Sequence, residues 1–171
     1  MKVAIVGAEE SKWNSKDKDY SGMTQLAYAR WSVGSLLYDM KLKENLAWSD
    51  MTVVSGHCPR GGVDIWAEEV ADELEIKKEI YSAPANQWDD KIEITHHNFD
   101  NASLTEVRQT LKGFKSRNIQ IAEASDVLYC LSPKANSVCI HCKTTGHLKN
   151  GGCWTLRYAE KLGKKVVRLV I

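Results

Sequence analysis

Four residues near the carboxyl end of the chain have the types and the spacing of a metal site. Cys139, Cys142, His147 and Cys153 follow the pattern C-x2-C-x4-H-x5-C. A C-x2-C turn brings two thiolates within reach of one ion at about 2.3 Å, and a histidine and a third cysteine complete a tetrahedron. We therefore predict a zinc ion bound by these four residues. His141, between the first two cysteines, is the alternative fourth ligand; without metal, the cysteines would be small buried residues or reactive thiols.

The same segment is similar to a zinc knuckle, a short motif with one residue fewer before its last cysteine. The similarity includes Gly146 followed by His147, and four protein ligands form a closed, structural site. Zinc knuckles contact bases at the positions of Ile140 and Leu148, so binding of single-stranded nucleic acid is an alternative function. Its positive charge would come from Lys134, Lys143 and Lys149. We rank it second, because these lysines are few and the formal net charge of the chain is +1.

Glycine-rich turns indicate a second kind of chemistry. Gly7 ends one apolar segment, the stretch SGHCPRGGVD (55 to 64) ends another, and Gly151 and Gly152 open a helical pattern. In an open parallel sheet, ligands bind beyond the carboxyl ends of the strands, where helix N-termini present free N–H groups to anions. The turns therefore indicate a phosphate site, although neither a P-loop nor the motif G-x-G-x-x-G is present. The alternative is that the glycines only make tight turns.

Hydrophobic patterning predicts the elements that position these residues. Short apolar runs rich in β-branched residues are typical of buried parallel strands. They lie at 3 to 6, 52 to 56, 79 to 83, 126 to 131 and 165 to 171. Helical spacing predicts helices over roughly 23 to 45, 62 to 75, 103 to 124 and 152 to 162. The alternation predicts a doubly wound, three-layer α/β/α fold with a mainly parallel sheet.

Local signals support two of the helix ends. Ser103 with Glu106 has the pattern of a capping box, and Gly163 stands where a helix ending at Leu162 needs a left-handed residue. Two segments, 84 to 102 and 133 to 150, are expected to be loops. Long loops in compact domains are commonly functional or are ordered by something extra, such as a metal ion.

The composition is typical of a soluble globular protein. The 171 residues are 43% hydrophobic and 26% charged, with 23 basic against 22 acidic residues and no membrane-spanning apolar run. The near-neutral charge argues against a dedicated duplex-DNA binder. We expect a single domain over 1–171 with a zinc-binding insertion at 133–153. The odd number of cysteines and the lack of a signal-peptide pattern predict a cytoplasmic protein with reduced thiols.

Three stretches together resemble the SLOG superfamily of Rossmann-like nucleotide-binding domains. They are VVSGHCPRGGVDIWAEEVADELEI, SRNIQIAEASDVLYCL and GGCWTLRYAEKLGKKV. The superfamily includes molybdenum-cofactor-carrier-like proteins and cytokinin-activating phosphoribohydrolases. The resemblance covers most of the chain, least at 8 to 50 and 84 to 102, and implies a nucleotide or nucleotide-derived ligand at the strand ends. Because members often pair, it also implies a homodimer.

The ligand candidates are Gly7 from the first turn and the residues that match the superfamily's motifs. The matching residues are Gly56, Arg60, Gly61, Gly62, Asp64, Arg117, Asn118, Gly151, Gly152 and Thr155. The fork of Arg117 suits a phosphate, and the amide of Asn118 suits a ribose or a base edge.

One departure from the superfamily bears on catalysis. The phosphoribohydrolases have a PGGxGTxxE motif with a catalytic glutamate, whereas GGCWTLRY here has Trp154 for the third glycine and Tyr158 for the glutamate. Glu160 lies two residues further on. The departure argues against hydrolysis of that kind, and a nucleotide-processing hydrolase of another kind is an alternative function.

A polar stretch offers other candidates for catalysis. Asp89, Asp90, His96 and His97 lie in one expected loop. These residue types suit proton transfer or a second metal. The alternative is a loop that is merely solvated.

Two tryptophans and the two remaining cysteines complete the candidates. Trp88 and Trp154 are candidates for stacking on a base, with plain packing as the alternative. Cys58 lies in a glycine turn and is a candidate reactive thiol. Cys130 lies in an apolar run and is expected in the core.

Overall fold

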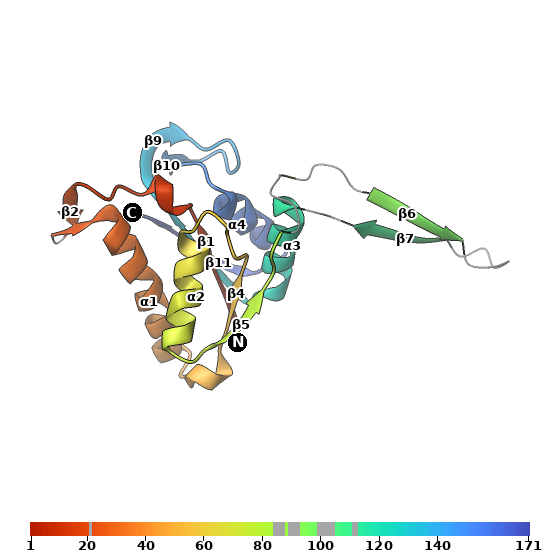
Figure 1. Ribbon diagram of the computed structural model, residues 1–171, viewed down its shortest axis with the longest axis horizontal. Helices are drawn as coiled ribbons and strands as arrows, with labels where there is room; N and C mark the ends of the chain where they lie inside the picture. Colours follow the sequence, from red (N-terminus) through yellow and green to blue (C-terminus); the bar gives the residue numbers. More distant parts are fainter. Residues whose placement is uncertain (21, 84–87, 89–92, 99–104, 111–112) are drawn as a thin grey trace.

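The computed structural model describes residues 1–20, 22–83, 88, 93–98, 105–110 and 113–171. Five parallel strands form its main sheet (Figure 1): β1 (Lys2–Gly7), β4 (Thr52–Ser55), β5 (Lys77–Ile80), β8 (Val127–Ser132) and β11 (Lys165–Val170). The α-helices of the described residues are α1 (Gln25–Lys43), α2 (Val63–Glu73), α3 (Phe114–Ala124) and α4 (Gly151–Lys161).

The strand order of the sheet is β11-β8-β1-β4-β5. The chain builds outward from β1 to β4 and β5, returns to the other side of β1 at β8, and reaches the edge with β11. This is the order of a Rossmann-type sheet, in which the direction of building reverses between β1 and β8. The predicted α/β fold with a mainly parallel sheet is confirmed. The reversal marks the place at which such sheets bind ligands.

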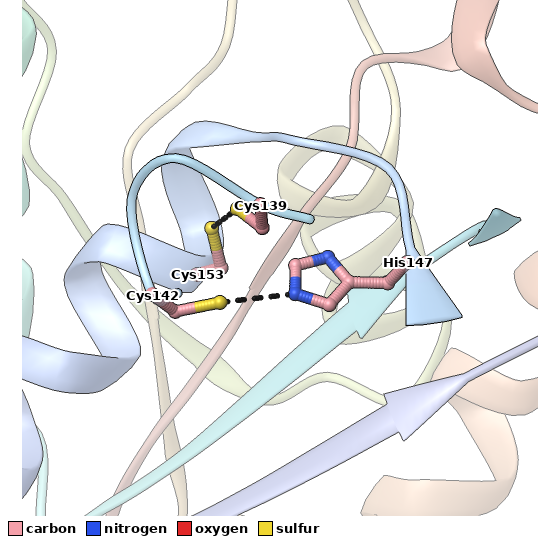
Figure 2. A group of neighbouring side chains, drawn as sticks. All are labelled: Cys139, Cys142, His147 and Cys153. Atoms are coloured by element: carbon pink, nitrogen blue, oxygen red, sulfur yellow. Dashed lines mark hydrogen bonds between the residues drawn. The ribbon is translucent and has the colours of Figure 1, made fainter. Parts of the chain in front are cut away.

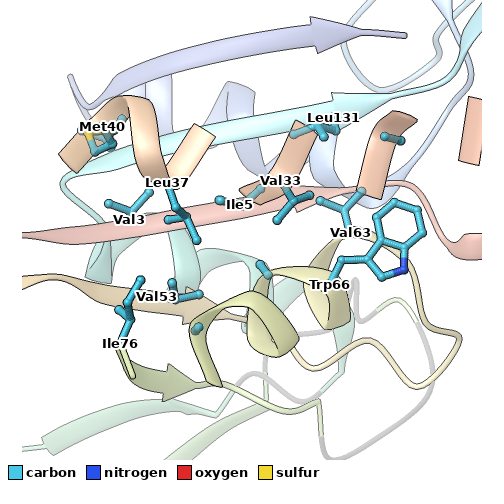
Figure 3. Close-up of a cluster of buried hydrophobic side chains, with 14 of the residues drawn as sticks. Val3, Ile5, Val33, Leu37, Met40, Val53, Val63, Trp66, Ile76 and Leu131 are labelled. Atoms are coloured by element: carbon cyan, nitrogen blue, oxygen red, sulfur yellow. The ribbon is translucent and has the colours of Figure 1, made fainter. Parts of the chain in front are cut away.

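Two hydrophobic layers hold helices against the two faces of the sheet. Because successive side chains of a strand point to opposite faces, Val3 and Ile5 of β1 belong to one layer and Ala4 and Val6 to the other. Helices α1 and α2 cover the first layer, around the buried Trp66 (Figure 3). Helices α3 and α4 cover the second. The second layer also contains the cysteines of the predicted zinc site, so that site continues the core.

Shorter elements surround the main sheet. Strands β2 (Lys18–Tyr20) and β3 (Met23–Thr24) form one antiparallel pair, β6 (Glu93–Asn98) and β7 (Thr105–Thr110) a second, and β9 (Lys134–Val138) and β10 (Thr145–His147) a third. Single 3-10 turns lie at Glu10–Lys12 and Trp48–Asp50. The β6–β7 pair extends away from the main sheet (Figure 1).

The helix expected over 103 to 124 is wrong in its first half. Strand β7 occupies part of that range, and α3 begins only after Gly113, whose φ is 103°. Glu106 lies in β7, so the capping-box pattern starts no helix there, and Ser103 lies outside the described residues. The β-branched Thr105 and Val107 favour an extended chain, and β6 supplies the antiparallel partner. The loop expected over 84 to 102 is correspondingly wrong at β6.

The loop expected over 133 to 150 is also partly wrong, because it contains β9 and β10. A two-stranded pair is marginally stable alone, and here the turn between the strands carries Cys139 and Cys142 of the buried cluster. The strand expected at 79 to 83 begins two residues earlier, at Lys77, and ends three residues earlier, at Ile80. Gly163 takes the left-handed conformation, with φ of 73°, as predicted. Among the described residues, no helix has the length and apolar character needed to cross a membrane.

Candidate metal centre and adjoining pocket

The structure gathers Cys139, Cys142, His147 and Cys153 in one buried cluster (Figure 2). Their ligand atoms, three sulfurs and one imidazole nitrogen, all lie within 4.8 Å of one another. The two sulfurs of Cys139 and Cys153 are 3.3 Å apart, and Sγ of Cys142 is 3.1 Å from Nε2 of His147. A tetrahedron with metal–sulfur distances of about 2.3 Å has edges of about 3.8 Å. The cluster can therefore hold a metal ion after small side-chain movements.

A tight turn and a helix end bring the four side chains together. Two backbone hydrogen bonds of 2.8 Å close the turn after β9, from N of Lys143 to O of Cys139 and from N of Cys139 to O of Thr144. Lys143 is left-handed, with φ of 59°, and this reversal turns the chain from the two cysteines back into β10. Gly146, with φ of 94°, turns β10 so that its histidine faces them. The first turn of α4 supplies the third thiol.

The backbone carbonyl group of Leu148 orients the imidazole of His147. Its Nδ1 lies 2.8 Å from the carbonyl oxygen of Leu148. A carbonyl oxygen can only accept, so Nδ1 carries the proton and Nε2 directs its lone pair at the cluster. This is the arrangement that metal-bound histidines need. His141, the alternative fourth ligand, does not join the cluster and lines the adjoining pocket instead.

The surroundings of Cys142 favour a thiolate. Burial raises the pKa of its thiol, but hydrogen bonds with Thr144 and His147 outweigh burial and lower the pKa to about 6. Two arginines add positive charge nearby: Arg157 donates to the carbonyl of Cys142 at 3.1 Å, and Arg168 donates to the hydroxyl of Thr144 at 2.9 Å. Three thiolates around a divalent ion leave a net negative charge, which these guanidinium groups offset.

A pocket with a volume of about 350 Å³ adjoins the cluster at the reversal point of the sheet. It is bounded by the end of β1 and by the first turns of α2, α3 and α4. Most of the predicted ligand residues line it: Gly7, Arg60, Gly61, Asp64, Arg117, Asn118, Gly151, Gly152 and Thr155. The free N–H groups of helix N-termini attract anions. The pocket therefore suits a ligand with a negatively charged group.

Gly56 and Gly62 do not line the pocket, but they make room for residues that do. A Cβ on Gly56 would lie 2.8 Å from Nε of Arg117 and 2.9 Å from Oδ2 of Asp64. Only a hydrogen atom leaves space for those two side chains. Gly62 is the N-cap of α2 with φ of 95°, a conformation that other residues rarely adopt. Direct contact of either glycine with a ligand stays a prediction.

Arg117 and Asn118 form a buried polar pair on the pocket wall. Nε and Nη2 of Arg117 donate to Oδ1 of Asn118 at 3.1 and 3.0 Å, and Nη1 donates to the carbonyl of Gly56 at 3.3 Å. The guanidinium lies over the ring of Phe114, 5.0 Å from its centroid. These contacts fix the amide of Asn118, whose Nδ2 is buried and has no hydrogen-bond partner among the described residues. A buried unpaired donor costs about 1–3 kcal/mol, so a ligand acceptor there would be stabilising.

Asp64 is a buried carboxyl group in the first turn of α2. Burial raises its pKa from 3.8 to about 6, against the opposing effect of the positive charge of Arg117. The group therefore binds a proton at mildly acidic pH and is mainly a carboxylate at neutral pH. As a carboxylate it can accept hydrogen bonds from ligand hydroxyls.

Asn150 is the main functional residue that the sequence analysis missed. It is the N-cap of α4, is 2% exposed and lines the pocket. Its Oδ1 accepts from N of Cys153 at 2.9 Å, and its Nδ2 donates to Oγ of Ser132 at 2.8 Å. An asparagine directly before a helical pattern is an N-cap signal that the sequence does contain. Lys12 and Lys149 also line the pocket, and no sequence motif joins these distant positions.

The residues weighed for hydrolysis do not form a site in the part of the chain that the structure describes. Tyr158 packs against the second hydrophobic layer, and Glu160 is exposed. Neither lines the pocket. Asp89 and Asp90 lie outside the described residues. His96 and His97 are placed in β6 by their backbone, and their side chains lie outside the description.

The thiols of both remaining cysteines have raised pKa values. Burial raises the pKa of the Cys58 thiol, which argues against the reactive thiolate considered from the sequence. Cys130 lies in the core as predicted, and burial raises its pKa to about 12.

Comparison of the chain with family models, curated proteins and solved structures gives no match. The fold and the site define a Rossmann-like α/β protein with a buried Cys3His cluster beside the ligand-binding end of its sheet. The resemblance to the SLOG superfamily rests on sequence motifs alone.

Proposed function

We propose that this protein binds a nucleotide or nucleotide-derived ligand in the pocket, and that a structural zinc ion in the cluster orders that pocket. The observation that carries the proposal is the buried Nδ2 of Asn118, which is unpaired among the described residues. A Cβ built on Gly151 would lie 3.7 Å from this nitrogen. The donor therefore lies beside the N-terminus of α4, where phosphates bind in related architectures.

The other polar groups of the pocket suit a sugar phosphate. Lys12, Arg60 and Lys149 add positive charge near the helix N-termini, and the carboxylate of Asp64 can accept from sugar hydroxyls. The volume of about 350 Å³ is at the lower end of the range for small-molecule sites. The size favours a mononucleotide over a dinucleotide. The motifs that resemble the SLOG superfamily support the same ligand class.

Zinc is the metal that the cluster favours. Three sulfurs and one imidazole in a tetrahedral arrangement are typical of structural zinc sites, and four protein ligands leave no open position for catalysis. Zinc binding to a segment of this kind contributes an apparent free energy on the order of 10 kcal/mol, which is enough to order the turn between β9 and β10. Because Cys153 belongs to the first turn of α4, zinc would also fix the helix end that lines the pocket.

Native mass spectrometry and calorimetry test this function on protein purified without chelator. We expect one zinc per chain and binding of at least one of the four ribonucleoside monophosphates. Asn118→Asp keeps the acceptor for Arg117 and replaces the unpaired donor with a second acceptor. We expect it to weaken nucleotide binding at least about tenfold with zinc content unchanged. Asn136→Asp, at an exposed position of β9, controls for the added charge.

Two results would remove the nucleotide proposal. One is the absence of binding by all four nucleotides to the zinc-loaded protein. The other is equal nucleotide affinity in the wild type and Asn118→Asp. Product peaks in the same spectra would reveal a nucleotide-processing hydrolase.

Binding of single-stranded nucleic acid is a second candidate. It is favoured by exposed apolar side chains on and directly before the turn at 139 to 144, which we call the metal-binding turn. Val138 and Ile140 are 60% and 59% exposed, and Lys134 and Lys143 are exposed nearby. Exposed apolar groups among lysines can contact unstacked bases. A fluorescent single-stranded oligonucleotide would then bind at low salt, release at high salt, and bind Ile140→Ala more weakly. No binding at low salt would exclude this function.

A further inference from the structure

His141 belongs to the metal-binding turn but faces the pocket. It lies between Cys139 and Cys142 in the sequence, is half-buried and lines the pocket. Its ring stacks on that of Trp88, with centroids 5.8 Å apart and planes inclined by 27°. Trp88 lines the same pocket. These two rings, from segments far apart in the sequence, form an aromatic wall.

Two rings of α4 support this aromatic wall from outside the pocket. Trp154 meets Trp88 edge-on, with centroids 5.2 Å apart. Tyr158 in turn stacks on Trp154, with centroids 5.5 Å apart and planes inclined by only 8°. Trp154 and Tyr158 do not line the pocket. Because the wall is held by its neighbours, little conformational freedom is lost when a ligand packs against it.

The polar groups of the pocket account for a phosphate and a sugar, and they leave the aromatic wall without a role. Flat π surfaces are what nucleobases stack on, and such stacking tolerates any base because every base has a π face. We infer that a nucleobase of the ligand packs against His141 and Trp88, while the phosphate meets Asn118 and the N-terminus of α4. This inference rests on the proposed nucleotide-binding function. The ligand is then a mononucleotide that carries a base, as opposed to a base-free sugar phosphate.

The aromatic wall also gives the metal-binding turn a part in specificity. Cys139 and Cys142 flank His141 closely, so an ion bound by both thiols fixes the turn that carries the imidazole. The metal-binding turn then does more than order the start of α4, because its His141 supplies one of the two rings that the base contacts.

Calorimetry with two probes tests the inference on the zinc-loaded protein. Adenosine 5′-monophosphate carries the base, and ribose 5-phosphate lacks it. For the wild type we expect adenosine 5′-monophosphate to bind about tenfold more tightly or better. For His141→Ala we expect this preference to fall about tenfold, with binding of ribose 5-phosphate and zinc content unchanged. Trp31→Ala, which removes an exposed ring of α1 that does not line the pocket, should keep the full preference.

The outcomes separate the inference from the proposed function. The inference is overturned if both probes bind equally, or if His141→Ala keeps the preference for adenosine 5′-monophosphate. The proposal that the pocket binds a nucleotide then still stands. If neither probe binds the wild type, another ribonucleoside monophosphate that does bind takes the place of adenosine 5′-monophosphate. If none of the four binds, the proposed function fails and the inference fails with it. If His141→Ala loses zinc, Trp88→Ala decides, because Trp88 is not one of the cluster residues. If Trp88→Ala keeps the preference for adenosine 5′-monophosphate, base binding by the aromatic wall is overturned. If Trp88→Ala loses this preference, base binding by the wall is supported.

Discussion

His147 and Asn150 donate to the same acceptor, the backbone carbonyl oxygen of Leu148. Nδ1 of His147 lies 2.8 Å from that oxygen and Nδ2 of Asn150 lies 3.1 Å from it. Asn150 also accepts from the backbone N–H of Cys153. Through these bonds the imidazole, the third thiol and the first turn of α4 form one hydrogen-bonded unit. The geometry of the Cys3His cluster and the shape of the pocket are therefore linked by direct contacts.

The first prediction concerns Asn150→Ala. The change removes the N-cap of α4 and the donor to the Leu148 carbonyl, so the imidazole of His147 loses part of its orientation. We expect zinc affinity to fall about 10- to 100-fold, measured by competition with a chelator. We also expect the free energy of unfolding to fall by on the order of 1–2 kcal/mol.

Thr24→Ala is the matched control for the lost cap. Thr24 caps α1, and its side chain accepts from N of Ala27 at 3.2 Å. We expect Thr24→Ala to lower stability by about 1 kcal/mol and to leave zinc affinity unchanged. Equal zinc affinity in both variants would contradict the linkage through Leu148.

The second prediction concerns Cys142→Ser. Loss of one thiolate leaves three ligands, so we expect zinc to be lost from the purified protein and the thermal unfolding midpoint to fall sharply. Nucleotide affinity should fall as well, because the turn and the start of α4 lose their common anchor. Cys58→Ser is the control, since this thiol lies outside the cluster, and it should retain full zinc content. Unchanged zinc content and ligand affinity in Cys142→Ser would show that the coupling is wrong.

The third prediction compares two adjacent glycines of α4. A Cβ on Gly152 would lie 2.7 Å from N and 2.8 Å from Cα of Gly7, so α4 would have to move away from β1. The corresponding Cβ on Gly151 would meet its nearest neighbour, Nδ2 of Asn118, at an ordinary 3.7 Å. We expect Gly152→Ala to destabilise by about 1–3 kcal/mol in urea unfolding. Gly151→Ala should change stability by less than about 1 kcal/mol. Similar stabilities of the two variants would argue against close packing of α4 on β1.

The sequence is sufficient to predict the central strands β1, β4 and β8, because each is a short apolar run that is mostly buried. The edge strand β5 is largely exposed, and the strand expected at 79 to 83 overlaps only its end. The sequence is insufficient for the β6–β7 and β9–β10 pairs. In the first, Glu106 completes a helix-cap pattern, yet the chain there pairs with a second segment that no local pattern identifies. In the second, the strands flank the turn that carries Cys139 and Cys142, and no local pattern identifies their pairing.

The candidate site likewise contains features that the sequence predicts and features that it does not. The spacing of Cys139 and Cys142 predicts a metal site at this turn, because two thiols separated by two residues can reach one ion. The direction of His141 is not predictable, since spacing alone does not show which side chain of a turn faces inward. Contacts of the pocket that cross the fold, such as Lys12 with the carbonyl of Lys149 at 3.3 Å, likewise appear only once the elements are assembled.

The fourth prediction is a dependence of stability on pH that originates at Asp64. Its pKa is raised from 3.8 to about 6, so between about pH 4 and pH 6 the folded state binds a proton that the unfolded state has released. Stability from this group is therefore present at low pH and is lost as pH rises through about 6. The loss is on the order of 2–3 kcal/mol.

Asp64→Asn separates this effect from the metal, because protons also displace zinc from thiolates in the same range. The amide resembles the protonated acid and does not titrate, while the cluster is the same in both proteins. Urea unfolding between pH 4 and pH 7 should show Asp64→Asn gaining stability relative to the wild type by on the order of 2–3 kcal/mol as pH rises. A stability difference that does not vary with pH would mean that Arg117 compensates the buried carboxylate fully. Asp64 would then be an ordinary ion-pair partner in place of a group that titrates near neutral pH.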